Sequence, residues 1–380
     1  MRIALSTGGG DAPGLNAVIR AATFAARRRG WDVVGIRDGF NGILFPDQYP
    51  DGQGMFPLDA RNVRGIGHLG GTMLGSTNRG NPCRFPVVQP DGTVTYVDRT
   101  VELVGRFREE GIDALISIGG DGSLSIAQRL YEEGLRVIGV PKTIDNDLDH
   151  TLMTFGFTTA VEIATESIDR LFTTAASHSR VFVVEVMGRD AGWIALYAGV
   201  ASGAHVILIP EIPFSYESVA RAITRRERNG AHYTIVVVAE GAAPIGGHTE
   251  IIDRPADHAE RLGGIGHVVA ENLTRLTGKE ARTVVLGHLV RGGTPTATDR
   301  LLGSRFGAAA VRALDEGQNG VMVALNEPVV EYVTLAEAVG KLRVVPMDCD
   351  TLLAGRELGT SFGDEPPGPE DGEDGEDGAD

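Results

Sequence analysis

The chain has 380 residues, of which 42% are hydrophobic, so it can bury a sizeable core, and its length favours two lobes. Its formal net charge of -16 excludes a general nucleic-acid binder, and no apolar run or leader predicts membrane insertion or export. Cys83 and Cys349 match no zinc or redox spacing, which favours a reducing, cytoplasmic setting over a disulfide framework.

The chain opens with a predicted strand at 2–6 and a predicted helix at 17–28, joined by a turn that contains Gly9 and Gly10. Glycines at such a turn let backbone N–H groups approach a phosphate, with the positive end of the helix behind them. A tight structural turn is the alternative.

After a second strand at 31–36, the glycine-rich stretch 65–80 predicts a loop whose one arginine, Arg79, suits closure over an anionic ligand.

A second turn of the same kind follows a predicted helix at 100–110 and a strand at 114–118. It contains Gly120, Asp121, Gly122 and Ser123, and it leads into a predicted helix at 124–133. The turn predicts a nucleotide or polyphosphate site, in which Asp121 is a candidate magnesium ligand.

The stretch 141–149 follows a predicted buried strand at 135–140, where open α/β sheets place their ligands. In an extended segment Asp145 and Asp147 project to the same side, so one can act as a base while the other positions magnesium. Lys142 adds a positive charge for a phosphate. A polar loop that caps the next helix is the alternative for this stretch.

Further along the chain, a helix at 158–175 precedes strands at 181–186, 206–209 and 233–239 and a strand beginning near Arg282, each followed by a polar cluster. This alternation predicts a doubly wound α/β fold with mostly parallel sheets. Residues 361–380 are rich in Asp, Glu, Gly and Pro and predict a disordered, solubilising acidic tail.

Five stretches together resemble the signatures of the phosphofructokinase family, in order and over residues 1 to about 358. They are Gly9 to Asn16, Gly119 to Ser123, Pro141 to Asp147, Glu185 to Arg189 and Gly287 to Gly293. The resemblance implies Mg²⁺-dependent transfer of a phosphoryl group to the 1-hydroxyl of fructose 6-phosphate, in glycolysis, at an active site in the cleft between two doubly wound lobes.

The resemblance also implies roles for individual residues. Asp145 would be the general base, with Thr143 and Asp147 close to the transferring phosphate, Lys142 and Arg189 in the catalytic set, and Asp121 as the magnesium ligand. The implied donor site comprises Gly9, Gly10, Asn78, Arg79, Gly120, Asp121, Gly122 and Ser123. The implied sugar-phosphate site comprises Thr143, Asp145, Met187, Gly188, Arg189, Glu240, His288 and Arg291, with Arg180 and Arg282 reaching across from a neighbouring subunit.

The donor in this family is ATP or pyrophosphate, and two positions track the choice. Pyrophosphate-dependent members carry aspartate at the position of Gly122 and lysine at that of Lys142, whereas many bacterial ATP enzymes carry glycine at both. We give Gly122 more weight, because a carboxylate there would crowd and repel the α-phosphate of ATP, and we expect ATP. Pyrophosphate or dual use is the alternative.

Many ATP enzymes also carry an arginine where this chain has Asn78, so Arg79 is a substitute one residue later.

The family's architecture implies a donor-binding lobe from 1–156 and 290–340, a sugar-binding lobe from 157–289, and a segment 341–360 that packs back on them. Shared active sites imply a homodimer or homotetramer. Two alternatives stay open: an inert regulatory subunit of the same fold, which would be expected to lose Asp121, Asp145 or Asp147, and another kinase with a Gly-Gly-Asp-Gly turn, such as one acting on NAD.

Overall fold

The computed structural model describes residues 1–253 and 261–366. The chain forms two compact units, each described by itself. Unit 1 contains Met1–Ile163 and His288–Val344, together with Asp253 and Arg261. Unit 2 contains Ala164–Ile252, Leu262–Gly287 and the described residues from Val345 onward.

Unit 1 is built on an eight-stranded sheet with the order β16-β15-β7-β6-β1-β2-β3, to which β8 adds by pairing with β7. The strands are β1 (Arg2–Thr7), β2 (Asp32–Ile36), β3 (Met55–Pro57), β6 (Ala114–Gly119), β7 (Val137–Thr143), β8 (Phe155–Gly156), β15 (Val321–Asn326) and β16 (Val329–Thr334). The central strands are parallel and almost fully buried, and only β3 and β16 pair antiparallel in this sheet. Continuous Val, Ile and Leu runs suit strands covered on both faces.

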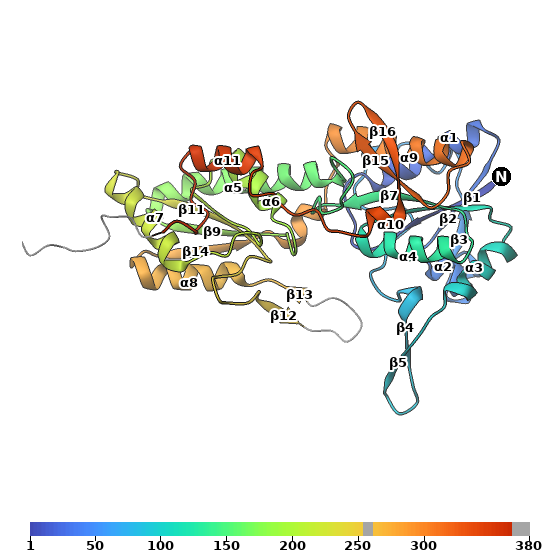
Figure 1. The fold of residues 1–380 in the computed structure, drawn as a ribbon, viewed down its shortest axis with the longest axis horizontal. Helices are drawn as coiled ribbons and strands as arrows, with labels where there is room; N and C mark the ends of the chain where they lie inside the picture. Colours follow the sequence, from blue (N-terminus) through green and yellow to red (C-terminus); the bar gives the residue numbers. More distant parts are fainter. Residues whose placement is uncertain (254–260, 367–380) are drawn as a thin grey trace, which may run out of the picture. The chain divides into compact units, whose positions relative to one another are not determined.

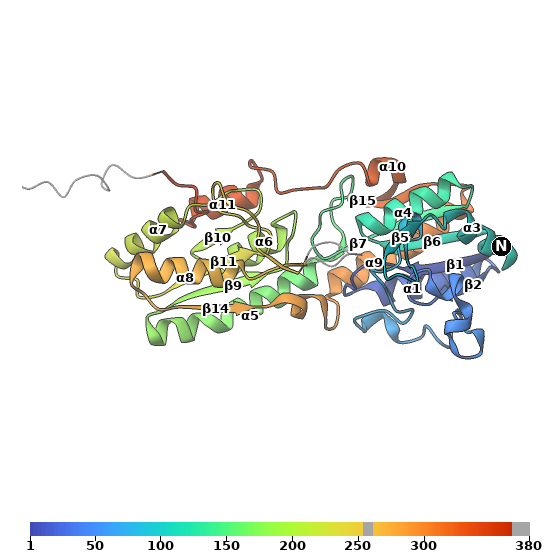
Figure 2. The same ribbon diagram turned by 90° about the horizontal axis from the view of Figure 1, so that it is seen from below.

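Helices cover both faces of this sheet, with α1 and α9 on one side and α3 and α4 on the other (Figure 2). The helices of unit 1 are α1 (Leu15–Arg28), α2 (Asn41–Leu44), α3 (Thr100–Glu109), α4 (Asp121–Glu132), α9 (Ala297–Asp315) and α10 (Leu335–Ala338). Phe306 of α9 is buried in one core and Phe107 of α3 in the other. A small antiparallel hairpin, β4 (Phe85–Val88) with β5 (Val94–Val97), extends from this unit (Figure 1).

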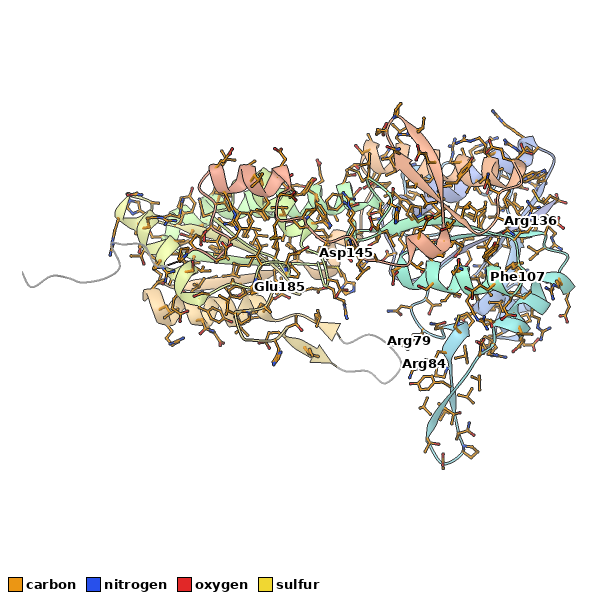
Figure 3. The ribbon with its side chains drawn as sticks, in the orientation of Figure 1. Arg79, Arg84, Phe107, Arg136, Asp145 and Glu185 are labelled. Atoms are coloured by element: carbon orange, nitrogen blue, oxygen red, sulfur yellow. The ribbon has the colours of Figure 1, made fainter. Side chains whose placement is uncertain are left out.

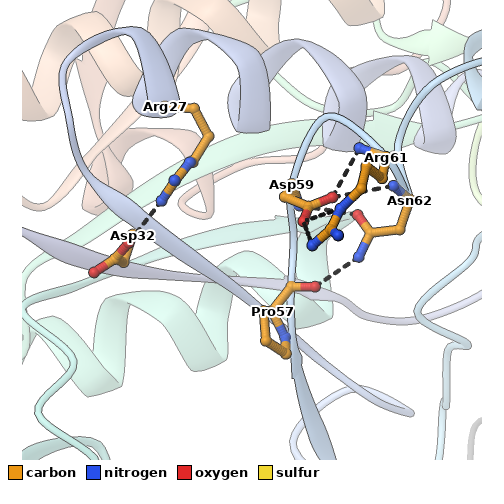
Figure 4. Close-up of polar contacts among 6 residues, drawn as sticks. All are labelled: Arg27, Asp32, Pro57, Asp59, Arg61 and Asn62. Carbon is orange, nitrogen blue, oxygen red and sulfur yellow. Dashed lines mark hydrogen bonds and ion pairs between the residues drawn. The ribbon is translucent and has the colours of Figure 1, made fainter.

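Polar contacts fix the turn after β3 (Figure 4). The Asp59 carboxylate accepts hydrogen bonds from the backbone N–H of Arg61 at 2.7 Å and from its guanidinium at 2.8 Å, and the Asn62 amide donates to the Pro57 carbonyl at 2.7 Å. Arg27 and Asp32 form an ion pair at 2.6 Å between α1 and β2. Both groups are exposed, so this pair contributes at most about 1 kcal/mol.

Unit 2 contains a four-stranded, wholly parallel sheet with the order β10-β11-β9-β14. Its strands are β9 (Val181–Val186), β10 (Val206–Leu208), β11 (Thr234–Ala239) and β14 (Ala281–Val285). Its helices are α6 (Trp193–Ser202), α7 (Tyr216–Arg228), α8 (Ile265–Thr277) and α11 (Asp350–Glu357), and α5 (Phe157–His178) begins in unit 1 and continues into unit 2. Alternate strand residues such as Val181 and Val183 pack against α7 and α8. A two-stranded ribbon, β12 (Ile251–Asp253) with β13 (Arg261–Leu262), completes the described strands.

The mostly parallel sheet of unit 1 and the parallel sheet of unit 2, with helices on their faces, confirm the predicted α/β fold class. The predicted end of the central strand at Val140 is wrong, because β7 continues through Lys142 to Thr143, where β8 pairs with it. The predicted start of the acidic tail at Ser361 is also wrong: Ser361 and Phe362 are buried, since the one aromatic ring of that stretch packs into unit 2. Residues 367–380 lie outside the described residues.

One titratable group of unit 2 makes folding stability depend on pH. Burial and, to a smaller extent, the nearby Arg226 guanidinium lower the pKa of His205 to about 4. Its Nδ1 accepts a hydrogen bond from the Ile235 backbone N–H at 2.8 Å, and its ring meets those of Phe172 and Tyr233. The folded state therefore holds a neutral imidazole, whereas the unfolded chain binds a proton below about pH 6.5.

We predict that His205 removes stability as the pH falls from about 6.5 towards 4, because only the unfolded state gains the proton in that window. After allowance for partial exposure, the loss between pH 7 and pH 5 is on the order of 1 kcal/mol. Chemical denaturation at both pH values should show a smaller pH dependence for His205→Asn than for the wild type. The exposed His232→Asn is the matched control, and an equal pH dependence in all three proteins would contradict the assignment.

Candidate active site

Three neighbouring parallel strands of unit 1, β1, β6 and β7, end at the same edge of the sheet, and the turns that follow them form the walls of one cavity. The cavity has a volume of about 310 Å³. It is lined by the predicted residues Gly9, Gly10, Asn78, Arg79, Gly120, Asp121, Gly122, Ser123, Lys142, Thr143 and Arg291. The structure thus brings together every residue that was predicted for the donor site.

The start of α4 forms one wall of this cavity. The helix begins at Asp121, three residues earlier than predicted, and no side chain caps its N-terminus at Gly120. Gly120 to Ser123 line the cavity, so the backbone N–H groups of the first helical turn, which have no acceptor within the helix, and the positive end of the helix dipole lie at its wall. Such a helix start is a binding site for phosphate oxygens.

Gly122 leaves the space beside this helix start open. A Cβ atom built on Gly122 meets no other atom within 4 Å. A Cβ on Gly119 would instead lie 2.2 Å from the Ser123 Cβ, so that glycine is needed for close packing. The open space at Gly122 therefore determines how large a phosphorylated group this wall of the cavity accepts.

Lys142 is a buried cation at the base of the cavity. Its side chain is 4% exposed, and its Nζ donates a hydrogen bond to the Gly10 carbonyl. Burial and, to a smaller extent, Arg291 lower the pKa of the ammonium to about 8, while Asp11, Asp145 and Asp147 act in the opposite direction. The Arg291 guanidinium donates to the Asp11 carbonyl at 3.1 Å, so two cations lie against the first glycine turn.

The glycine-rich loop packs directly on the same turn. The Gly9 N–H donates to the Thr77 carbonyl at 3.0 Å, and the Ser76 hydroxyl donates to the Gly9 carbonyl at 2.5 Å. Gly9 has a φ of +75°, a conformation that side chains rarely adopt. These contacts place Asn78 and Arg79 at the cavity wall, and Arg79 is marked in Figure 3.

Asp145 follows β7 in a turn rather than in an extended segment (Figure 3). Asn146 has a φ of +52°, so the expectation of an extended segment, in which Asp145 and Asp147 would project to the same side, is wrong. The Asp145 N–H donates to the Thr143 hydroxyl at 3.1 Å, and the Thr154 N–H donates to the Asn146 side-chain oxygen at 3.1 Å. These side-chain contacts favour a turn over continued strand pairing.

The chain beyond α10 also contacts this turn, at Asp147 and Leu148. The Arg343 N–H donates to the Asp147 carbonyl at 2.8 Å, and Leu342 forms a bridge with Leu148. One carboxylate oxygen of Asp145 and one of Asp147 are buried from solvent. Both carboxylates are thus held in fixed positions next to the buried ammonium of Lys142, whose pKa both of them raise.

Unit 2 gathers a second set of predicted residues at the carboxyl ends of its strands. Met187, Gly188 and Arg189 follow β9, and Glu240 follows the neighbouring strand β11. The Glu240 N–H donates to the Val186 carbonyl at 2.9 Å, and the Gly241 N–H donates to the Gly188 carbonyl at 3.0 Å. The structure therefore brings these four residues together in one unit, and the cleft between the lobes stays a prediction.

Arg180 and Arg282 lie elsewhere in unit 2 and share a carboxylate. Arg180 pairs with Glu280 at 2.6 Å, and Arg282 pairs with the other oxygen of the same side chain. Both arginines are at least partly exposed to solvent. His288 belongs to unit 1, in the 3₁₀ turn η5 (Gly287–Arg291), and is exposed.

The donor atoms at the cavity fit a magnesium ion that is bound mainly through phosphate oxygens and water. The Asp121 carboxylate lines the cavity, whereas no group of three or more Asp, Glu, His or Cys side chains within residues 1–253 and 261–366 has the geometry to hold a metal. Mg²⁺ commonly binds through one or two carboxylates plus substrate phosphates. Asp121 is the residue in this cavity that would hold it.

The cavity also contains residues that were not predicted. Phe40, Ile126 and Pro82 add an apolar section to its lining, and Ser117 and Asn81 add polar groups. Phe40 comes just after β2, whose carboxyl end lies at the same sheet edge, so strand position could have indicated it. Ile126 lies one turn into α4 and carries no signal that separates it from a core residue.

None of the described helices is long and apolar enough to cross a lipid bilayer.

Comparison with known proteins confirms the resemblance. The phosphofructokinase family model matches residues 2–314. The ATP-dependent 6-phosphofructokinase of Chloroflexus aurantiacus is 52% identical over 364 residues, which is 96% of this chain and 98% of that protein. The pyrophosphate–fructose 6-phosphate 1-phosphotransferase of Amycolatopsis methanolica is 50% identical over 350 residues, which is 91% of this chain and 96% of that protein.

A solved structure agrees with these relatives. Phosphofructokinase from Saccharomyces cerevisiae superimposes with a TM-score of 0.73 at 31% identity, over 89% of this chain. The match spans 45% of the length of the yeast chain. The chain therefore belongs to the phosphofructokinase family of phosphotransferases.

Proposed function

We propose that the protein is a Mg²⁺-dependent 6-phosphofructokinase that transfers the γ-phosphoryl group of ATP to the 1-hydroxyl of fructose 6-phosphate. The main support for this proposal is the cavity of unit 1. It brings together a helix start without a side-chain cap, the buried Lys142, and Gly122 with open space beside it. Phosphoryl transfer depends mainly on positioning and charge neutralisation, and these groups supply both.

Asp145 acts as the general base that takes the proton from the attacking hydroxyl. The fixed turn that holds it supports this role, because a base must stay within hydrogen-bond reach of the proton it removes. Thr143 and Asp147 lie next to the transferring phosphate. Lys142 and Arg79 neutralise charge on that phosphate, and the magnesium ion held by Asp121 supplies further neutralisation when bound.

The residues assigned to the sugar phosphate are Met187, Gly188, Arg189, Glu240, His288 and Arg291. Arg180 and Arg282 serve the site of a neighbouring subunit in a homodimer or homotetramer. Their exposure and their shared partner Glu280 support this assignment, because two guanidinium groups around one carboxylate form a site that also suits a phosphate.

A pyrophosphate-dependent reaction is the second candidate, and Lys142 favours it. A buried lysine at this position accompanies pyrophosphate use in the family, and relatives named for pyrophosphate are about as similar to this chain as those named for ATP. ATP is preferred here because of the open space at Gly122 and the apolar lining from Phe40 and Ile126, which suits the adenine ring. Rates measured with each donor separately decide between them.

Replacement of Asp145 tests the general base. Asp145→Asn should lower kcat by about 100-fold or more with little change in KM for fructose 6-phosphate, because the amide keeps the shape but cannot accept the proton. Asp149→Asn alters another carboxylate of the same loop and should keep near-normal turnover. Turnover close to wild type in Asp145→Asn would overturn the assignment.

A carboxylate at position 122 tests the donor. Gly122→Asp should lower kcat/KM for ATP by about 100-fold, since a negative charge would occupy the space next to the α-phosphate. The same change should affect kcat/KM for pyrophosphate much less. Gly105→Asp, at a glycine of α3 with equally open surroundings, controls for the loss of a helical glycine. Equal losses with both donors would contradict this account of donor choice.

The lowered pKa of Lys142 predicts a pH dependence for donor binding. Because its ammonium is protonated below about pH 8, kcat/KM for the donor should fall as the pH rises through that value. Lys142→Met should lower kcat/KM at pH 7 by about 10-fold or more and abolish that fall. Lys341→Met, at an exposed lysine, should behave as the wild type. A fall near pH 8 that persists in Lys142→Met would assign it to another group.

A further inference from the structure

The chain beyond α11 is firmly attached to unit 2 up to Glu365. Ser361 pairs with Val206 as a parallel bridge at the edge of the sheet, with the Ile207 N–H donating to the Ser361 carbonyl at 2.9 Å. Phe362 is fully buried, and the Ser215 N–H donates to the Gly363 carbonyl at 2.8 Å. Asp364 pairs with Arg356 at 2.6 Å. The part of the chain that follows Glu365 therefore starts from a defined place on the surface of unit 2.

That place is the first half of α7. The Ser218 hydroxyl donates to the Glu365 carbonyl at 3.0 Å, and the Arg221 guanidinium donates to the same oxygen at 2.9 Å. The Glu365 carboxylate accepts from the Ser361 hydroxyl at 2.8 Å and from the Phe362 N–H at 3.1 Å. The chain thus leaves the described part of the molecule next to Arg221.

The same face of α7 continues with arginines. Arg221, Arg225 and Arg228 follow the i, i+4, i+7 spacing that places side chains along one face of a helix. Arg225 and Arg228 are exposed, and within the described part of the chain no ion pair is found for either. Arg275 of the neighbouring helix α8 is also exposed. A backbone hydrogen bond lowers the pKa of Glu217, the acidic residue of the first turn of α7, and the charges of Arg275 and Arg221 lower it further. The other acidic residue of this helix, Glu227, pairs with Lys279.

We propose that residues 367–380 dock on this arginine face of α7 in their own chain. The segment carries seven carboxylates at positions 370, 371, 373, 374, 376, 377 and 380, and no cation. From Glu365 to Glu370 the chain can span up to about 17 Å, whereas Arg221 and Arg228 are about 10 Å apart along the helix. The first acidic residues therefore reach every arginine of the face. The segment and the arginine face have opposite charges, and Glu365 is held next to Arg221. For both reasons we infer that the chain's own acidic segment binds this face.

Docking in this way gives the acidic segment a role in addition to solubility. It neutralises an arginine face that would otherwise attract polyanions, and it depends on ionic strength because the groups lie at the surface. Each pair is weak, but attachment at Glu365 holds the carboxylates at a high local concentration.

A peptide competition experiment tests the proposal. A fluorescent peptide of residues 367–380 should bind a chain that ends at Pro366 at least 10-fold more tightly than it binds the full chain, whose own segment competes. Arg225→Gln/Arg228→Gln in the shortened chain should weaken binding at least 5-fold, and 0.5 M NaCl should abolish it. Equal binding to the full and shortened chains, or to the shortened chain with and without these substitutions, would overturn the proposal. A circular dichroism melt of the double variant checks that it folds.

A photo-crosslinking group placed at position 373 of the full chain distinguishes docking on α7 of the same chain from docking on α7 of a neighbouring subunit. The proposal predicts a crosslink within one polypeptide, to a fragment containing 216–228. A product of doubled mass on a denaturing gel, or crosslinks spread over the surface, would contradict it. Turnover of fructose 6-phosphate by the chain that ends at Pro366 should stay within about twofold of the full chain, because α7 contributes no residue to the proposed site.

Discussion

The burial of one ammonium group organises the site of unit 1. Lys142 lies at the end of the central strand, 4% exposed, with its Nζ bound to the Gly10 carbonyl. A buried cation is costly unless it is paired, and burial alone lowers its pKa. Carboxylates at Asp11, Asp145 and Asp147 oppose that shift, so the turns after β1 and β7 are tied together electrostatically. The cavity proposed to bind the phosphoryl donor is the space between these turns and the start of α4.

Parallel strands are the reason that residues so far apart in the chain meet. β1, β6 and β7 are adjacent and run in the same direction, so the turns after Thr7, Gly119 and Thr143 must lie at one edge. Each turn contributes a different type of group: backbone N–H donors, a helix start, and charged side chains. The same rule places Met187 to Arg189 and Glu240 together in unit 2, where a sugar phosphate is the proposed ligand.

Sequence reasoning predicted the α/β class and the composition of the donor cavity because glycine-rich turns after buried strands are local signals. The Gly120 to Ser123 turn is an example, since strand, turn and helix lie within a few residues of one another. It failed where pairing with a distant segment decided the conformation. Lys142 and Thr143 look like part of a polar loop, but β8 pairs with both of them and both are buried. Phe362 is a single aromatic residue in an acidic stretch, and its burial depends on contacts with α11, which local composition cannot reveal.

The most direct test of the proposed activity is the rate of fructose 1,6-bisphosphate formation from fructose 6-phosphate and Mg²⁺, with ATP and pyrophosphate supplied in separate assays. We predict turnover with ATP and little or none with pyrophosphate, because the open space at Gly122 accepts the α-phosphate of the nucleotide. Turnover with pyrophosphate alone would mean that the buried Lys142 sets the donor. Activity with neither donor would contradict the catalytic assignment and favour an inert subunit of the same fold.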